Sequence, residues 1–151
     1  MTTLTSEYRV HKAAEILGRQ FRNVNYGSEA LLAPFREADQ NGSEIASDGN
    51  RRLALLGRSV VETVLLTRWY HTGAERRSAD TIINTLASKV AFADLALQNG
   101  LDSCVKRSRR QESGIMKPET LKLTITAIIG AIFLDSGFNH GEVEAVMERI
   151  G

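Results

Sequence analysis

The 151-residue sequence contains one cysteine, two prolines and 6% aromatic residues, and each scarcity excludes a class of protein. Because Cys104 is alone, it cannot form an internal disulfide, so the sequence is not that of a disulfide-stapled secreted domain. We therefore expect an intracellular, reducing environment. The low proline content, with 42% hydrophobic and 25% charged residues, is typical of a compact globular chain. We expect residues 1–151 to form a single domain.

Long hydrophobic runs and an excess of one charge are also missing. The longest apolar stretch, Ile125 to Leu134, is far shorter than the roughly 20 residues that span a bilayer, so no membrane partner is expected. No secretory or transit pattern opens the chain, and the sequence does not distinguish cytoplasm, nucleus and mitochondrion. The net charge of +1, from 19 basic and 18 acidic residues, excludes a surface that is basic throughout. The net charge is still compatible with a local basic patch that binds nucleic acid.

Apolar residues recur at intervals of three and four, which predicts helices, whereas the alternation typical of strands is nearly absent. One predicted helix begins with a cap at Ser78 or Asp80 and ends at the Asn99–Gly100 stop signal. The sequence predicts a helix over residues 119–134 that is opened by Pro118, and we expect it to be buried at the centre because it is apolar on most sides. Residues 141–150 form a last amphipathic helix.

Two further helices are predicted around residues 13–21 and 53–64 from the same spacing. Between the helices, the sequence predicts loops at Asp39–Asn50, His71–Arg77 and Lys106–Gly114, which are rich in small polar or basic residues. The expected fold class is therefore all-α, with about six or seven helices.

Two segments resemble the motifs of one family. Asn50–Glu62 reads NRRLALLGRSVVE and resembles the signature helix of the ribonuclease III family, usually NERLEFLGDAVLE. Leu123–Asp135 reads LTITAIIGAIFLD and resembles the second family helix, usually DxxEAIIGAIYLD. Weaker resemblances at residues 16–21 and 93–101 extend the similarity to nearly the whole chain. The resemblance implies an all-helical ribonuclease III domain that pairs as a two-fold homodimer around a cleft for double-stranded RNA.

The resemblance also implies where catalytic residues should be. Family members cut RNA with four carboxylates, two on each signature helix, which bind Mg²⁺ and position a water molecule. Here the four positions hold Ala54, Arg58, Leu123 and Thr126, and none of them is acidic. An arginine repels Mg²⁺, and the other three side chains offer at most one weak oxygen ligand. We therefore expect no metal cofactor and a catalytically inactive member of the family, a pseudoenzyme.

Glu62 and Asp135 are the remaining candidates for a displaced metal site. Both coincide with acidic positions of the family pattern outside the quartet, so surface or capping roles are the simpler interpretation. Glu62 is also four residues after Arg58, a spacing that favours an ion pair on one helix face. The histidines, which lack ligand spacing, are His11, His71 and His140. Cys104 has no catalytic context and is expected to be a buried structural thiol.

The candidate RNA-binding residues are Arg51, Arg52, Arg58, Lys106, Arg107, Arg109 and Arg110. Arginine suits phosphate because its planar guanidinium can bond two oxygens at once. The resemblance places Arg58 in the RNA-facing cleft, whereas a solvated loop is the alternative for residues 106–110. At the position of Leu55 the family commonly has an aromatic residue that enters a socket in the partner, so Leu55 is the expected dimer-interface residue.

Three functions remain in competition. The first is an inactive ribonuclease III-like domain that binds structured or double-stranded RNA, or pairs with an active homologue in RNA processing. The second is an architectural component of a ribonucleoprotein, such as a mitochondrial ribosome. The third is a divergent, active, Mg²⁺-dependent endonuclease for double-stranded RNA. No double-stranded RNA-binding domain is visible in the sequence, so affinity for free RNA is expected to be weak.

Overall fold

The computed structural model describes residues 5–107 and 114–151, and these are mostly helical, as predicted. In chain order the elements are α1 (Ser6–Leu17), α2 (Val24–Ala30), β1 (Phe35–Ala38), β2 (Glu44–Ser47), α3 (Arg51–Thr72), α4 (Arg77–Leu86), α5 (Lys89–Gln98), the 3₁₀ helix η1 (Leu101–Cys104), α6 (Pro118–Asp135) and α7 (His140–Ile150). In the described part of the chain, no helix has both the length and the hydrophobicity to cross a bilayer.

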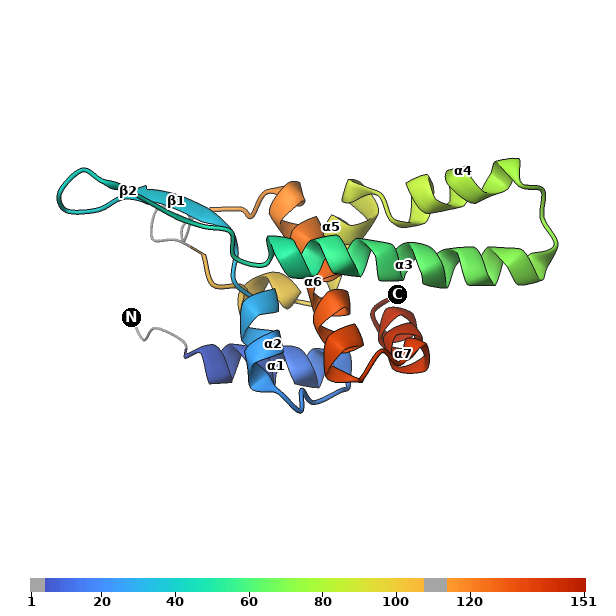
Figure 1. Cartoon of the computed structure of the whole chain (residues 1–151), viewed down its shortest axis with the longest axis horizontal. Helices are drawn as coiled ribbons and strands as arrows, with labels where there is room; N and C mark the ends of the chain where they lie inside the picture. Colours follow the sequence, from blue (N-terminus) through green and yellow to red (C-terminus); the bar gives the residue numbers. More distant parts are fainter. Residues whose placement is uncertain (1–4, 108–113) are drawn as a thin grey trace.

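Helix α6 runs through the middle of the molecule, which confirms the predicted central helix (Figure 1). Pro118 occupies its first turn, where a missing backbone N–H costs nothing. Side chains on all sides of the helix are buried, among them Ile125, Ile128 and Ile132. Helices α2, α3, α5 and α7 pack around it. Burial of this apolar helix is therefore the main source of the hydrophobic core.

Two glycines let α3 and α6 cross at close range. A Cβ atom on Gly57 would collide with the backbone oxygen of Thr126, and one on Gly130 would collide with that of Leu53. A residue with a side chain at either position would push the two helix axes apart. This crossing brings the two motifs that the sequence analysis identified into direct contact.

The helix predicted from Ser78 or Asp80 to Asn99 is wrong in two respects. Neither residue is its cap, because α4 begins at Arg77, and the structure divides the segment into α4 and α5. Ser88 adopts an extended backbone conformation, and its hydroxyl accepts a hydrogen bond from the N–H of Ala91. This serine thus caps a new helix inside a continuous apolar pattern. The predicted end is confirmed, since α5 ends at Gln98 and Gly100 has a φ of 74°.

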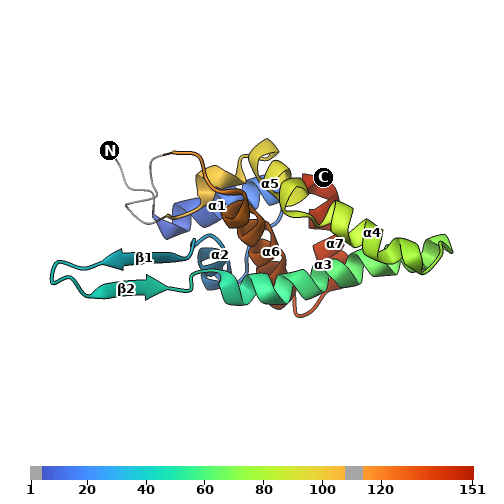
Figure 2. The same cartoon turned by 90° about the horizontal axis from the view of Figure 1, so that it is seen from above.

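The loop predicted at residues 39–50 is also wrong in part, because β2 lies inside it. Strands β1 and β2 form an antiparallel hairpin in which Phe35 pairs with Ser47 and Ala38 with Glu44. The Asp39 carboxylate accepts hydrogen bonds from the N–H groups of Asn41 and Ser43 and so shapes the turn. Figures 1 and 2 show the hairpin projecting from the helical body. Most of its residues are exposed, so the strands lack the apolar alternation of a half-buried sheet.

The opposite end of the molecule is formed by the second half of α3 and by α4, which lie side by side (Figures 1 and 2). Gly73, with a φ of 71°, ends α3, so the predicted loop at residues 71–77 shortens to 73–76. The indole N–H of Trp69 donates to the hydroxyl oxygen of Ser78 and joins the two helices. The predicted loop at residues 106–114 lies largely outside the described residues.

Candidate functional site

A hollow of about 180 Å³ lies where α3 and α6 meet the link between α4 and α5. Helix α3 contributes Arg58 and Glu62 to its wall, and helix α6 contributes Lys122 and Thr126. The α4–α5 side contributes polar groups as well, including Asn84. We call this feature the cationic hollow, because two of these side chains are cations and only one is an anion.

The structure brings two of the four expected catalytic positions, Arg58 and Thr126, to the cationic hollow. Ala54 is 5% exposed and belongs to the core, and Leu123 packs against the core without lining the hollow. The hydroxyl of Thr126 donates to the backbone oxygens of Lys122 and Leu123, at 2.9 and 3.2 Å. These four side chains offer no carboxylate, and so they do not fit Mg²⁺, which prefers hard oxygen ligands.

Lys122 is a basic residue of the hollow that sequence reasoning missed. It precedes Thr126 by four residues and therefore lies on the same face of α6. That spacing was readable from the sequence, but only the packing of α6 on α3 brings Lys122 to the same hollow as Arg58. Among the described residues, no hydrogen bond or ion pair occupies either of these two cationic side chains.

The expected ion pair between Arg58 and Glu62 is wrong, since these two described side chains make no such contact. The orientation explains the result. An acidic residue that precedes a basic one by four positions interacts favourably with the helix dipole, and the reverse order found here is weaker. Glu62 therefore remains a single carboxylate facing two cations.

Asp135 has a structural role rather than a place in the hollow. It ends α6 nine residues after Thr126, roughly 14 Å further along the helix axis. Its carboxylate accepts hydrogen bonds from the backbone N–H groups of Arg22 and Asn23 and from the guanidinium of Arg19, at 2.8–2.9 Å. Within the described residues, no three histidine, cysteine or acidic side chains gather as metal ligands. The displaced metal site is therefore not assembled.

Burial on its own would raise the pKa of Asp135, but the opposing interactions prevail. Hydrogen bonds from the backbone of Asn23 and Arg22, and the charge and hydrogen bond of Arg19, hold the pKa of this carboxyl below its usual value. Asp135 is thus an ionised capping group that ties α6 to the segment between α1 and α2.

Helix α3 carries the predicted interface residues on one exposed face. Arg51, Leu55 and Arg58 follow one another at helical spacing, and all three side chains are exposed. Leu55, the fifth residue of α3, is 59% exposed. Arg51 lies within 3.5 Å of Asp48, and Arg52 is exposed next to it.

The other basic candidates lie elsewhere. Lys106 lines a small surface depression with Arg9 and Glu29, and this depression shares no residue with the cationic hollow. Arg107 donates a hydrogen bond to the backbone oxygen of Gly114. Arg109 and Arg110 lie outside the described residues. Among the described residues of this group, Lys106 and Arg107 do not line the cationic hollow.

The remaining reactive side chains have ordinary environments. Cys104 is fully buried, and burial raises the pKa of its thiol, as expected for a structural cysteine. The three histidines are on three different helices, α1, α3 and α7. His11 pairs with Glu15, His71 stacks edge-on against Tyr70, and His140 packs against Phe133.

Comparison with known proteins decides the family. A model of the family described as Ribonuclease-III-like matches residues 36–150, which is most of the chain and includes both motifs. The chain belongs to the ribonuclease III-like family. This ribonuclease III-like chain is 32% identical over 128 residues to Ribonuclease 3 of Borreliella afzelii, covering 82% of the chain and 51% of that relative. It is 30% identical over 131 residues to Ribonuclease 3 of Oleidesulfovibrio alaskensis, covering 84% and 56%.

The ribonuclease III-like chain therefore spans about half the length of the curated relatives it matches. Its fold is also that of a solved nuclease domain. The nuclease domain of ribonuclease III from Campylobacter jejuni superposes with a TM-score of 0.75 at 25% identity, over 93% of this chain and 92% of that one. A second structure of that domain, concerned with flexibility in a region involved in dimer formation, gives a TM-score of 0.77 at 24% identity.

Proposed function

We propose that this chain is a catalytically inactive ribonuclease III-type domain that binds structured or double-stranded RNA. The observation that carries the proposal is the cationic hollow at the crossing of the two family motifs, where the side chains of Arg58 and Lys122 have no hydrogen-bond or ion-pair partner among residues 5–107 and 114–151. Two nearby cations repel Mg²⁺ and attract phosphate. Glu62 alone is a poor magnesium site, because this ion binds through several oxygens in octahedral geometry.

We also propose that residues 1–151 act as one domain and pair as a two-fold dimer through α3. Support comes from Leu55, whose apolar side chain is exposed between two arginines on one helix face. Burial of that leucine against a second copy would remove its apolar surface from water. The arginines beside it would then border the same interface and remain available to an RNA duplex.

Binding of a generic RNA duplex, measured by fluorescence anisotropy at several salt concentrations, tests the proposal. If cations contact phosphates, affinity falls steeply with salt and shows little preference for sequence. The double variant Arg58→Glu and Lys122→Glu should lower affinity by more than about tenfold. Its matched control is Arg36→Glu with Lys117→Glu, which changes net charge equally at exposed positions outside the hollow.

Equal losses in both double variants would show that only net charge matters and would contradict the role of the hollow. Cleavage is measured in the same samples with and without Mg²⁺. We expect none. Robust Mg²⁺-dependent cleavage that disappears in Glu62→Ala would overturn the inactive assignment and support a divergent nuclease.

The hairpin favours a second candidate, an architectural component of a ribonucleoprotein. Residues 35–48 carry one basic side chain, Arg36, and four acidic ones, Glu37, Asp39, Glu44 and Asp48. Such a projection repels RNA phosphates and suits a protein neighbour. Absence of any affinity for free duplex, combined with salt-resistant cosedimentation with an assembled particle, would favour this candidate over the first.

A further inference from the structure

A second cavity lies on the other side of Phe92 from the cationic hollow. It has a volume of about 350 Å³, is lined by α3, α4, α5, α6 and α7, and is partly open to solvent. Among the described residues, only Phe92 lines both spaces. The volume is within the lower range of ligand pockets, which is about 300–1,000 Å³. It corresponds to the space of about a dozen water-sized groups.

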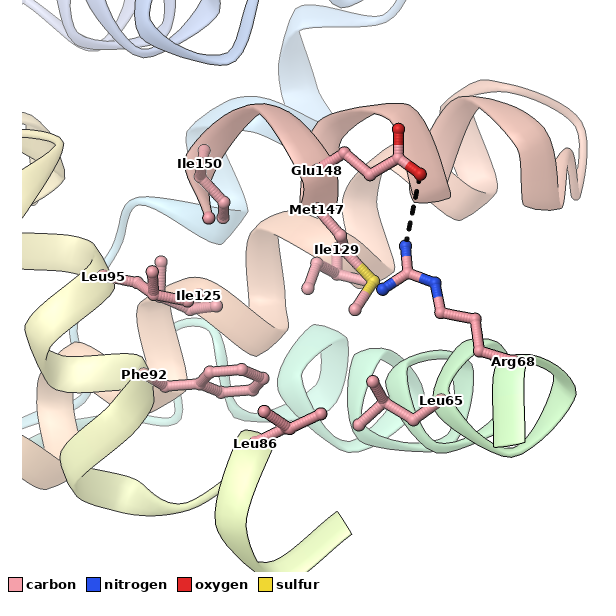
Figure 3. Close-up of a pocket in the computed structure, with 11 residues that line it drawn as sticks. Leu65, Arg68, Leu86, Phe92, Leu95, Ile125, Ile129, Met147, Glu148 and Ile150 are labelled. Atoms are coloured by element: carbon pink, nitrogen blue, oxygen red, sulfur yellow. Dashed lines mark ion pairs between the residues drawn. The ribbon is translucent and has the colours of Figure 1, made fainter. Parts of the chain in front are cut away.

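The walls of this cavity are mostly apolar, and Arg68 and Glu148 are the charged side chains among them. Figure 3 shows leucine, isoleucine, phenylalanine and methionine side chains from all five helices pointing toward one another around it. Water in such a space finds few hydrogen-bond partners, and apolar cavities of comparable size take up apolar molecules. The walls therefore select a ligand whose body is hydrocarbon.

One polar group marks an end of the cavity. Arg68 donates from Nε to Glu144 at 3.0 Å, but its Nη2 atom is buried and has no hydrogen-bond partner. Nη2 also lies 3.7 Å from a carboxylate oxygen of Glu148, which is an ion-pair distance but too long for a hydrogen bond, and the Arg68 side chain as a whole is 40% exposed. A buried donor without an acceptor is unfavourable, so an acceptor oxygen from a ligand would be stabilised there.

Charge decides which acceptor fits. The guanidinium of Arg68 already faces the carboxylates of Glu144 and Glu148, so this end of the cavity carries one excess negative charge. An anionic head group would be repelled, whereas the oxygen of a neutral amide or ester would accept a hydrogen bond from Nη2 at no electrostatic cost.

We propose that this cavity is a binding site for a neutral, elongated apolar molecule with one terminal hydrogen-bond acceptor, such as a medium-chain fatty amide. The hydrocarbon chain occupies the space between α5 and α7, and the carbonyl oxygen accepts from Nη2 of Arg68. The site shares the wall residue Phe92 with the cationic hollow but uses neither Arg58 nor Lys122, so the two proposals can be tested separately.

Octanamide and octanoate at pH 7 are the probes, since they have the same chain length and differ in head-group charge. Binding is followed by ¹³C-methyl shifts of Ile125, Ile129 and Met147 and by the thermal unfolding midpoint. Octanamide should shift these methyl signals and bind at least about tenfold more tightly than octanoate. Arg68→Met removes the donor and should weaken octanamide binding, but octanoate should bind no better, because Glu144 and Glu148 remain.

Two variants fill the cavity and one serves as control. Leu95→Trp, and Leu86→Trp at the half-exposed rim, should abolish octanamide binding. Leu97→Trp adds the same bulk to α5 at an exposed position outside the cavity and should leave binding unchanged. Absence of octanamide binding, or binding that survives both filling variants, would overturn the site. Equal or tighter binding of octanoate would overturn the assignment of a neutral head group.

Discussion

Nη1 of Arg19 lies 2.9 Å from Oδ2 of Asp135, and this ion pair joins the end of α6 to the segment after α1. The Asp135 side chain is 1% exposed and that of Arg19 is 12% exposed. Arg19 also donates from Nε to Glu142 in α7 at 3.1 Å. A single guanidinium therefore links three parts of the chain that are far apart in sequence.

Removing this carboxylate should destabilise the protein strongly. Asp135→Ala leaves two backbone N–H groups without their acceptor and leaves Arg19 with Glu142 as its remaining carboxylate partner, and we expect a loss of about 3–5 kcal/mol in the free energy of unfolding. Urea denaturation followed by circular dichroism measures it. The control is Arg36→Met, which breaks the exposed pair with Glu44 and should cost under about 1 kcal/mol. Similar losses in the two variants would contradict this account.

The same residue predicts how stability depends on pH. Because the folded-state pKa of Asp135 is lowered, its contribution is complete above the unfolded-state pKa of about 3.9. It is lost as the pH falls from there through the folded-state pKa. Urea midpoints between about pH 2 and pH 6 should therefore decline below about pH 4, and the decline should be shallower in Asp135→Asn. Parallel curves for the two proteins would refute the assignment.

The close crossing of α3 and α6 predicts intolerance at Gly57. Gly57→Ala places a Cβ atom against the backbone oxygen of Thr126, and backbone cannot rotate away as a side chain can. We expect a loss of roughly 3 kcal/mol or more in the free energy of unfolding. Gly141→Ala, in the first turn of α7 and exposed, should change stability by less than about 1 kcal/mol. If Gly57→Ala and Gly141→Ala changed stability equally little, α3 and α6 would be further apart than the structure places them.

Restoring the family's acids tests whether the fold still positions a metal site. The fourfold variant Ala54→Glu, Arg58→Asp, Leu123→Asp and Thr126→Glu should be less stable than the natural chain without metal, because carboxylates at buried positions repel one another. Mg²⁺ should raise its thermal unfolding midpoint and give a binding signal by calorimetry. The single variant Arg58→Asp should do neither, since one carboxylate holds this ion poorly. If Mg²⁺ neither raised the unfolding midpoint of the fourfold variant nor gave a binding signal, the four positions would not converge on one site.

The exposed leucine of α3 predicts the oligomeric state. We expect a dimer by light scattering at tens of micromolar, and Leu55→Asp should shift it toward monomer without lowering the free energy of unfolding of the monomer. Ile45→Asp, an equivalent change on the exposed hairpin, should leave the dimer intact. A natural chain that is monomeric at these concentrations would overturn the proposed pairing through α3.

Local sequence was sufficient to predict the central helix and the end of α5, and to identify the family. Pro118, the apolar residues of α6 and the stop signal at Asn99–Gly100 act within a few residues of themselves, so their spacing can be read directly. Local sequence was insufficient to predict the helix break at Ser88. A serine inside an apolar pattern can either continue a helix or cap a new one, and the packing of α4 and α5 decides between the two. The hairpin was not predicted, because its strands bury little apolar surface and so lack the alternation of apolar and polar residues that marks a half-buried strand.

By itself, the sequence determined the two family motifs, and its resemblance to the family predicts that the catalytic positions hold Ala54, Arg58, Leu123 and Thr126, none of which is acidic. Only the tertiary structure decided what each of them does. Lys122 and Arg58 are 64 positions apart in the chain and share a hollow because glycines let α3 and α6 approach. An aspartate such as Asp135 could in principle bind Mg²⁺. The fold instead buries its carboxylate against Arg19 and two backbone N–H groups. Such partners come from long-range packing, which the local periodicity of a chain does not contain.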